Sequence, residues 1–533
     1  MKEIQIDLIT QEILEAALIS ASQEMGGALK FSSYSPIIRD MEDFSCAIFT
    51  IDGDLVAQAD YIPAQLGAMS LVVKSVISTW DKNIHDGDVF ICNHPYQGAM
   101  HLPDVNVVAP VFHDGQVIAW VGTAAHHIDV GGVHPGSEGP ELQELFAEGL
   151  VIPPTRLYLK GEENLDLVAT ITANIRDPLS TVSDLRAQRA ACNLGMRRVL
   201  ELVESYGNPI VQQVFKNSLE SVEKAIRYRL SELPDGSGDA IGYLDDDGRS
   251  GPPTRVQVKI TKTGDSLTID LSGCDPQVAG AMNVPWASTR AGIVYAVRTV
   301  LAPQLAANDG VLRAVEIICP QGNVLNPFPP AAVSVRHNTC QRFADTAIRA
   351  LVDLWPHLQV AGSSVTFFGV NIGTTSPSTG QSTVLSDVVG GGTGASFEHD
   401  GLDGVDTYMS NVGLMPIEVL ETNYQVRVLK TELIDGSGGR GFRNGGMGIR
   451  REYQILDHTQ HATFYAEQTN PEFVAQGRNG GENGQPSKLT LIDPTGQIIP
   501  IPSKVSMDLE PGSVLRIETS GGGGFGEARH PKH

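Results

Sequence analysis

Two short stretches of the sequence combine histidine and aspartate at spacings that suit a metal site. The stretches run from residue 93 to 104 and from 126 to 132, and each contains a His-x-x-Asp step. Their histidines and aspartates are His94, His101, Asp104, His126, His127 and Asp129. One such step is common and means little, but imidazoles and carboxylates gathered at one place are typical of a transition-metal site. With an open coordination position, that site would be catalytic.

Counting residues along a predicted hairpin places two of these side chains at the same end. If Asp114-Gly115 forms a two-residue type I′ turn, residue 104 faces residue 125. Asp104 and His126 then emerge together at the open end of the hairpin. Strict alternation would put His127, rather than His126, on the face of Asp104, whereas a β-bulge or the end of the ladder would relax that rule. The count leaves the choice between the two histidines open.

Helices and hairpins alternate in the part of the chain that would position these residues. Asp43 opens a hairpin that turns at Asp52-Gly53, so it could supply a further carboxylate. Gly26-Gly27 is expected to weaken the end of the first helix. Apolar periodicity predicts the elements themselves. The predicted helices span residues 5–30, 69–80, 139–150 and 179–232, and the predicted strands span 44–51, 55–59, 89–92, 105–112 and 117–123.

The rest of the chain is rich in turns. The run from Pro234 to Gly238 ends the helical region and marks a domain boundary. Short strands follow to about residue 335 around a helix at 287–302, and then come a helix at 340–353 and a stretch dense in Gly, Ser and Thr. We expect a multi-domain, mixed α/β or α+β fold with a strand- and glycine-rich C-terminal half. The predicted domains are 1–233, which is α+β and carries the metal site, 234–360, which is α/β, and 361–533, which is mainly β.

Composition excludes several classes of function. The 533 residues carry a formal charge of −24, which repels phosphate backbones and anionic membranes, so neither nucleic acid nor membrane is an expected partner. No stretch is apolar enough for a transmembrane helix, and the first residues do not form a signal peptide. We therefore expect a cytoplasmic protein. The six cysteines are scattered, which favours reduced, mostly buried thiols.

Nucleotide-binding patterns are weak or missing. Gly436 to Gly441 matches GxGxxG, but glycines continue through Gly448, which does not suit a βαβ unit. The sequence contains no GxxxxGK[ST] loop. Any use of ATP must therefore depend on another fold or another chain.

Ordered blocks along nearly the whole chain resemble the hydantoinase B/5-oxoprolinase B family. In the N-terminal third the blocks are Asp43-Phe-Ser-Cys-Ala, Asn93 to Asp104, His126 to Gly132, and Pro135-Gly-Ser. Further on they are Gly273 to Pro285, Asn326-Pro with Pro329-Pro330, Arg342-Phe-Ala-Asp, Gly390 to Ala395, Asp400-Gly, Pro416-Ile-Glu418, Gly438 to Gly448 and Gly521 to Gly526. His94 and Ala99 depart from the family pattern, in which an Asp and a second Gly are expected.

This resemblance implies a two-component, ATP-dependent enzyme. A hydantoinase A-like partner would carry ATP and Mg²⁺ and activate a small cyclic amide, so the assembly would be a hetero-oligomer. This chain would hold one divalent Zn, Mn or Fe ion through Asp43, His101, Asp104 and His126. The resemblance thus favours His126 over His127. His127, Asp129 and His94 would orient ligands or carry protons.

The implied chemistry has a physical rationale, and two alternatives remain. Resonance protects cyclic amides from hydrolysis, O-phosphorylation removes that resonance, and a metal lowers the pKa of bound water to about 7. One alternative is the large subunit of an ATP-dependent ketone carboxylase of the acetone or acetophenone type. The other is a non-catalytic partner whose metal only stabilises the fold.

Overall fold

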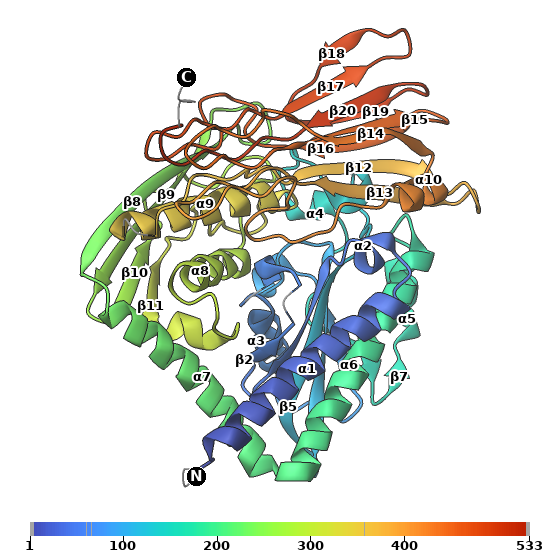
Figure 1. Ribbon diagram of the computed structural model, residues 1–533. Helices are drawn as coiled ribbons and strands as arrows, with labels where there is room; N and C mark the ends of the chain where they lie inside the picture. The colour runs from blue at the N-terminus through green and yellow to red at the C-terminus, as the bar shows by residue number, and fades with distance from the viewer. Residues whose placement is uncertain (1–4, 60, 66, 356–357, 529–533) are drawn as a thin grey trace.

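The computed structural model describes residues 5–59, 61–65, 67–355 and 358–528. These residues form four β-sheets with helices between and around them, in a mixed arrangement of helix and strand (Figure 1). The expectation of a mixed α and β fold is confirmed.

The N-terminal sheet has seven strands in the order β2-β1-β5-β4-β3-β6-β7, and every neighbouring pair is antiparallel. This order places β5 between β1 and β4. The strands are β1 (Phe44–Phe49), β2 (Leu55–Gln58), β3 (Val89–Cys92), β4 (Asp104–His113), β5 (Gln116–His126), β6 (Thr155–Leu159) and β7 (Glu162–Glu163).

Helices cover both faces of this sheet. Helices α1 (Leu8–Ser32) and α6 (Pro178–Tyr206) lie side by side on one face, where Cys46 and Ile48 of β1 point. Helix α3 (Met69–Trp80) packs on the other face against Ala47 and Phe49. Because both faces are covered, β1 is buried throughout instead of alternating between buried and exposed residues.

Three of the predicted helices differ from the structure. The long helix expected at 179–232 is broken at Gly207, whose φ of 88° is left-handed, into α6 and α7 (Asn208–Ser231). Gly26 lies inside α1 rather than weakening its end, and a Cβ there would come within 2.4 Å of the Tyr61 ring. The helix expected at 139–150 is wrong: only α4 (Leu145–Glu148) forms, and the Pro140 carbonyl accepts a tertiary hydrogen bond from the Ala281 backbone in the central region instead of a helical one.

The central region packs against α7. Its sheet has the order β11-β10-β9-β8, in which only β10 and β11 are parallel. Two helices pack between this sheet and the N-terminal one (Figure 1). The elements are β8 (Gly236–Leu244), β9 (Thr254–Thr263), β10 (Ser266–Asp270), β11 (Val315–Ile318), α8 (Trp286–Leu301) and α9 (Arg336–Leu354).

Two antiparallel sheets form the C-terminal region at the top of Figure 1. One has the order β13-β12-β16-β19, and the other β14-β15-β20-β17-β18. The strands are β12 (Phe368–Thr375), β13 (Ser382–Val389), β14 (Val426–Leu433), β15 (Ile449–Ile455), β16 (Gln460–Tyr465), β17 (Lys488–Ile492), β18 (Ile498–Pro500), β19 (Lys504–Leu509) and β20 (Val514–Glu518). The remaining helices are α2 (Pro36–Arg39), α5 (Leu165–Thr172) and α10 (Ile417–Asn423), with 3-10 turns η1 (Pro63–Gln65), η2 (Pro95–Gln97), η3 (Pro135–Ser137) and η4 (Asp309–Ala314).

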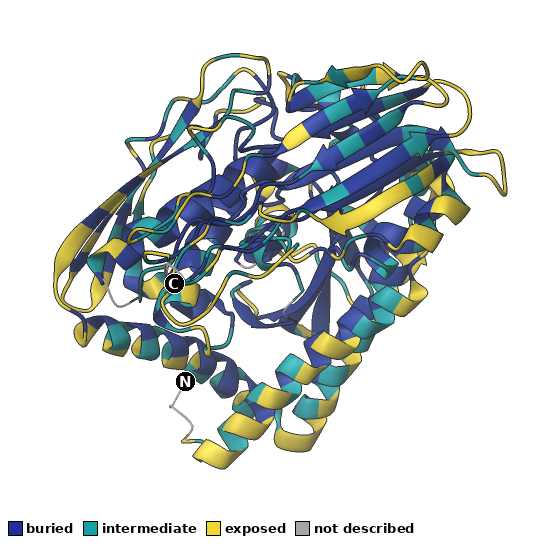
Figure 2. Cartoon of the chain, turned by 45° about the horizontal axis from the view of Figure 1, so that its top comes forward, coloured by how far each residue is buried: buried dark blue, intermediate teal, exposed yellow. Residues whose placement is uncertain are grey.

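One apolar core connects the regions, and it contains residues from Leu14 to Ile517. Figure 2 shows that exposed residues gather on the outer sides of the N-terminal helices and at the tips of the C-terminal strands. Within the part of the chain that the structure describes, no helix is long and apolar enough to cross a membrane.

Candidate active site

Three neighbouring strand ends bring Asp43, His126 and Asp104 together. Asp104 pairs directly with His126 across β4 and β5, and the His126 backbone N–H donates to the Asp43 carbonyl at 3.0 Å. Opposed residues share a face of a sheet, so the three side chains point the same way. His126 Nδ1 lies 3.4 Å from Asp104 Oδ1 and 3.9 Å from Asp43 Oδ2.

A β-bulge decides which histidine joins the cluster. Val111 pairs with Ala119, whereas Phe112 pairs with Val117, so Ile118 has no partner on β4. The extra residue shifts the register by one, and Asp104 faces 126 instead of the residue 125 that a regular ladder predicts. No residue pattern in the sequence predicts this bulge.

His127 consequently points to the opposite face of the sheet. Its Nε2 lies 3.0 Å from Gln188 Oε1 on α6, and its Nδ1 has no hydrogen-bond partner among the described residues. Burial lowers the pKa of His127. Its contacts are those of a side chain packed between sheet and helix.

His101 reaches the cluster from the segment before β4. Its Nε2 lies 3.1 Å from Asp104 Oδ2, and its Nδ1 lies 3.1 Å from the Ser334 carbonyl. A carbonyl can only accept, so a neutral His101 that donates from Nδ1 to Ser334 would present its Nε2 lone pair to a metal. One ligand atom from each of His101, Asp104 and His126 lies within 4.8 Å of the others, and all three residues are buried. Asp43 lies at the edge of this group, in contact with His126.

Mutual charges set the protonation of the cluster. Burial disfavours an ionised Asp104, yet His101, His126 and Arg336 hold its pKa well below the usual range. Burial also opposes a charged His126, but Asp104 and Asp43 raise its pKa to about 9. Burial raises the pKa of Asp43 to about 6. Two imidazoles and two carboxylates, all buried and packed this tightly, form a donor set that fits one divalent cation.

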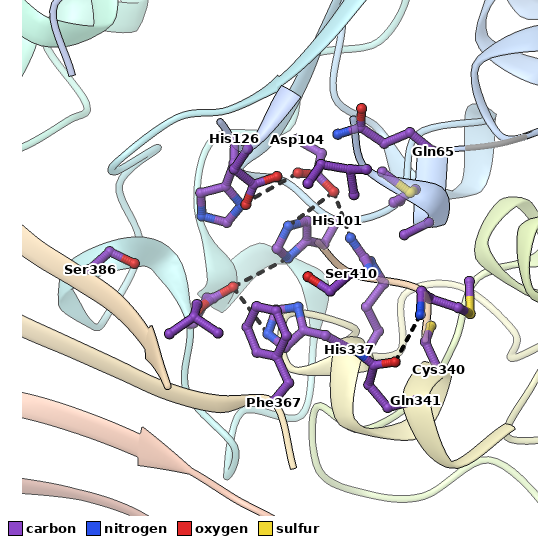
Figure 3. A pocket seen from close by; sticks show the side chains of 18 of the residues that line it. Gln65, His101, Asp104, His126, His337, Cys340, Gln341, Phe367, Ser386 and Ser410 are labelled. Atoms are coloured by element: carbon purple, nitrogen blue, oxygen red, sulfur yellow. Dashed lines mark hydrogen bonds and ion pairs between the residues drawn. The ribbon is translucent and has the colours of Figure 1, made fainter. Parts of the chain in front are cut away.

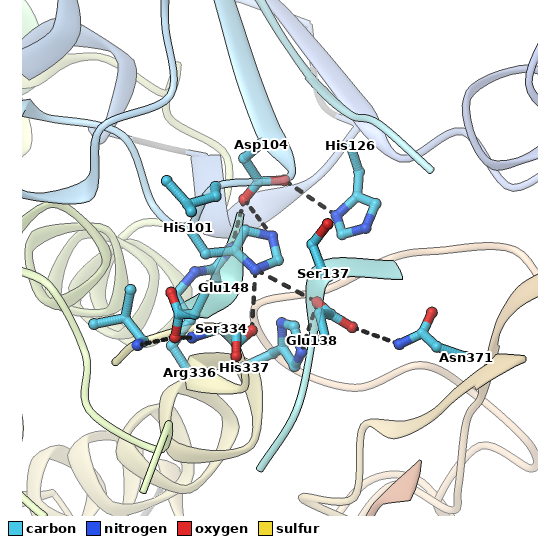
Figure 4. Close-up of polar contacts among 12 residues, drawn as sticks. His101, Asp104, His126, Ser137, Glu138, Glu148, Ser334, Arg336, His337 and Asn371 are labelled. Carbon is cyan, nitrogen blue, oxygen red and sulfur yellow. Dashed lines mark hydrogen bonds and ion pairs between the residues drawn. The ribbon is translucent and has the colours of Figure 1, made fainter. Parts of the chain in front are cut away.

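Sequence reasoning missed a second group of polar residues beside the cluster. Glu138 Oε1 lies 3.4 Å from His101 Nδ1 and 3.4 Å from His337 Nε2, and neither Glu138 Oε1 nor His337 Nε2 has a hydrogen-bond partner among the described residues (Figure 4). Arg336 Nη2 donates to Asp104 Oδ2 at 2.6 Å. Arg336 and His337 form the first turn of α9, just before the helix predicted at 340–353, and Glu138 directly follows the Pro135-Gly-Ser block.

Glu138 also ties this group to the C-terminal sheet. Its Oε2 accepts hydrogen bonds from Asn371 Nδ2 at 2.8 Å and from the Tyr465 hydroxyl at 2.5 Å. Asn371 belongs to β12 and Tyr465 to β16. Two residues that are far apart in the sequence therefore fix one carboxylate.

The clustered side chains open into a cavity of about 550 Å³, counting the part that reaches solvent (Figure 3). Its lining is polar around the cluster and apolar elsewhere. The polar lining residues are Asp43, Gln65, His101, Asp104, His126, Glu138, Arg336, His337, Gln341, Ser386, Ser410 and Tyr465. The others are Ile37, Ile62, Ala64, Met100, Cys340, Phe367, Val388 and Met409.

The three residues predicted to orient ligands or carry protons do not line this cavity. Besides His127, these are Asp129 and His94. Asp129 pairs with Arg176 at 2.8 Å and accepts hydrogen bonds from the backbone of Gly131 and Gly136, so it holds the loop that leads to Glu138. His94 Nδ1 accepts from the Tyr96 backbone at the start of η2. The catalytic roles of His94, His127 and Asp129 remain predictions.

Comparison with known proteins agrees with the resemblance seen in the sequence. The family model described as hydantoinase B/oxoprolinase matches residues 7–528. The putative B component of a D-/L-hydantoinase from Pseudomonas sp. is 33% identical, over 98% of this chain and 90% of its own length. The 5-oxoprolinase 1 of Arabidopsis thaliana is 32% identical over 98% of this chain, which spans 42% of that longer protein.

Solved structures show the same architecture. The ATP-dependent caprolactamase from Pseudomonas jessenii superposes with a TM-score of 0.92 at 26% identity, covering 98% of this chain and 92% of its own. Acetone carboxylase in its nucleotide-free form superposes with a TM-score of 0.88 at 19% identity, covering 97% of this chain and 75% of its own, which shows a shared fold. The chain belongs to the hydantoinase B/oxoprolinase family.

Proposed function

We propose that this chain is the metal-containing B component of a two-component, ATP-dependent cyclic amide hydrolase. It acts on a ring, such as a hydantoin, 5-oxoproline or another lactam, that a hydantoinase A-like partner has activated. The observation that carries the proposal is the buried cluster of His101, Asp104 and His126, with Asp43 at its edge, at the wall of a cavity that is partly polar and partly apolar.

These four side chains would hold one divalent Zn, Mn or Fe ion. A bound ion supplies Lewis acidity, both for polarising a carbonyl and for lowering the pKa of water. The chain's own residues prepare the site. The Ser334 carbonyl fixes the orientation of His101, and Arg336 fixes Asp104. Burial of the cluster strengthens the electrostatic interactions among these four side chains.

The proposed partner supplies ATP and Mg²⁺. This chain has no GxxxxGK[ST] loop, and its hydantoinase relative is named as one component of an enzyme. The chain spans only 42% of the Arabidopsis 5-oxoprolinase 1, so that protein has a large region with no counterpart in this sequence. We place substrate activation on a polypeptide that corresponds to such a region.

A ketone carboxylase is the second candidate, because acetone carboxylase shares the fold. The two reactions differ in their need for bicarbonate. The non-catalytic alternative, in which the metal only stabilises the fold, predicts loss of structure on metal removal without any dependence of turnover on the site.

The test is co-expression of this chain with a hydantoinase A-like partner. ADP release and ring-opened product are measured with hydantoin, 5-oxoproline, caprolactam and acetone, with and without bicarbonate. The same preparations are analysed for bound metal. His101→Ala should lose most of the metal and reduce turnover at least about 100-fold, because a ligand is removed.

His113→Ala is the matched control, since His113 lies at the far end of the same hairpin and its side chain is partly exposed. It should keep both metal and activity. Full activity in a metal-free His101→Ala preparation would refute the metal assignment. Carbon incorporation into acetone would establish the carboxylase instead.

A further inference from the structure

A second cavity, the α9 cavity, lies beside helix α9 and shares no described lining residue with the cavity at the His101 cluster. Its volume is about 500 Å³, counting the part that reaches solvent. Arg342, Asp345 and Arg349 of α9 line one side, and residues of β8 and of the segment 472–476 line the others. Figure 1 shows α9 next to β8 and β9. The charged residues of this cavity therefore belong to a site of their own.

The buried charges of the α9 cavity do not balance. Asp345 Oδ2 lies 3.3 Å from Arg342 Nη1 and 3.3 Å from Arg349 Nε, so one carboxylate faces two guanidinium groups. Arg342 is 5% exposed, and its Nε has no hydrogen-bond partner among the described residues. Burying a charge is costly unless an opposite charge compensates it. The net positive charge at this wall favours a ligand with an anionic group.

Backbone carbonyls hold both guanidinium groups in position. Arg342 Nη2 donates to the Phe473 carbonyl at 2.8 Å, and Arg349 Nη2 donates to the Ile241 carbonyl at 2.6 Å. A carbonyl accepts a hydrogen bond without supplying a full negative charge, so these contacts orient the arginines and leave their net charge uncompensated. Oriented guanidinium groups match the two oxygens of a carboxylate.

The α9 cavity also has an acidic residue at its exposed side. Glu472 is exposed and lines the cavity. Its carboxylate would repel a ligand that carries only negative charge, but it would attract one that also carries an ammonium group. Tyr243 and Phe473, whose ring centroids lie 5.0 Å apart, line the same cavity and offer apolar surface to a short methylene chain.

We propose that the α9 cavity binds a small amino acid, with its carboxylate on Arg342 and Arg349 and its ammonium group near Glu472. Arg342 Nε supplies one of the hydrogen bonds to the carboxylate. Charges of opposite sign hold the two ends of the ligand, so a simple carboxylic acid satisfies only half of the site. Binding here does not depend on the proposed hydrolase activity, because none of these residues lines the cavity at the His101 cluster.

The test measures dissociation constants of amino acids and of the matching carboxylic acids on the full chain. β-Alanine is compared with propionate, and γ-aminobutyrate with butyrate, so that each pair differs only in the amino group. Calorimetric titrations are run on wild type, Arg349→Gln, Glu472→Gln and Arg516→Gln, each in metal-free and Zn²⁺-loaded form. Arg516→Gln is the matched control, because Arg516 also pairs with one carboxylate, Glu452, at 2.7 Å but does not line this cavity.

Wild type and Arg516→Gln should bind the better of the two amino acids at least about 3-fold more tightly than its carboxylic acid counterpart, as expected for one exposed ion pair. Arg349→Gln should weaken the binding of both members of the pair at least about 10-fold, because a charged hydrogen-bond donor is lost. Glu472→Gln should bind the two members within about 2-fold of each other, because the ammonium group loses its partner. Each dissociation constant should be the same with and without Zn²⁺.

Equal binding by wild type and Arg349→Gln overturns this inference, as does absence of binding by wild type. Binding that requires Zn²⁺ also overturns it, since the carboxylate would then lie on the His101 cluster. A preference for the amino acid that survives in Glu472→Gln overturns the position given to the ammonium group. If Arg349→Gln does not fold, the Glu472→Gln comparison still decides, because this exposed substitution leaves both arginines in place.

Discussion

At the scale of single residues, Glu138 contacts both the histidines of the site and the C-terminal sheet. One carboxylate oxygen faces His101 and His337, and the other accepts from Asn371 and Tyr465. Groups that fix a metal-ligating histidine tune metal affinity almost as strongly as the ligands themselves. Glu138 therefore connects the buried cluster of His101, Asp104 and His126 to the C-terminal sheet.

Glu138→Gln should weaken metal affinity or lower kcat by about 10- to 100-fold without unfolding the protein. The substitution keeps the volume and one acceptor but removes the charge near His101. Metal affinity is measured by competition with a chelator, and kcat with the co-expressed partner. Glu141→Gln is the control, because Glu141 is partly exposed and pairs with His134. Wild-type metal affinity and kcat in Glu138→Gln would contradict this positioning role.

At the scale of elements, the glycine-rich stretches pack against one another. A Cβ on Gly522 would lie 1.9 Å from the Thr393 carbonyl, and the Gly522 N–H donates to the Gly446 carbonyl at 2.9 Å. Only glycine allows backbones to approach so closely. The GxGxxG pattern at 436–441 belongs to this packing, and the next element after it is strand β15 rather than a helix.

Gly522→Ala should lower the free energy of unfolding by about 1–3 kcal/mol or more, because the new methyl group meets backbone that has no room to move. Gly27→Ala is the matched control. Gly27 lies in α1 with nothing within 4 Å of the added Cβ, so alanine should stabilise the helix by about 0.5–1 kcal/mol. Thermal and urea unfolding measure the change in the free energy of unfolding for both variants. A neutral Gly522→Ala would show that this packing is looser than the structure indicates.

At the scale of the whole molecule, the site is assembled from all three regions of the chain. Asp43 and His101 come from the N-terminal region, Arg336 and His337 from the start of α9, and Tyr465 from the C-terminal sheet. One apolar core runs through these regions as well. The three-domain division at 233 and 360 stays a prediction, but the site needs every part to be in place.

Glu148 joins the N-terminal region to the segment before α9. Its Oε1 accepts from the backbone N–H groups of Val333 and Ser334 at 2.5 and 2.6 Å, while Oε2 is buried without a partner among the described residues. Burial raises its pKa from 4.5 to about 8. The folded state thus favours the protonated acid. This preference for the protonated Glu148 contributes fully to the free energy of unfolding below pH 4.5. The contribution is lost as the pH rises through about 8.

Glu148→Gln should therefore gain stability relative to wild type as the pH rises from about 5 to 8.5. Melting temperatures of both proteins, measured in the same metal state across this range, give the difference. The exposed Glu144 at the start of the same short helix provides the matched control variant, Glu144→Gln. A pH-independent difference for Glu148→Gln would show that this carboxyl ionises normally.

The sequence by itself determined the local elements and the family. Alternation, turn dipeptides and helical periodicity predict β3 and α3 with their observed bounds, because these signals depend on neighbouring residues. The hydantoinase B/5-oxoprolinase B resemblance, built on short ordered blocks, is confirmed. The His/Asp spacing also located the region where His101, Asp104 and His126 meet.

Only the tertiary structure decided which side chains face one another. The Ile118 bulge depends on strand pairing and twist, so no count along the sequence could choose His126 over His127. Glu138, Arg336 and His337 join the site because three distant segments pack together, and such long-range contacts leave no local pattern. Arg342 and Arg349 show the same limit, since their spacing places them on one face of α9 but does not reveal the cavity beside it.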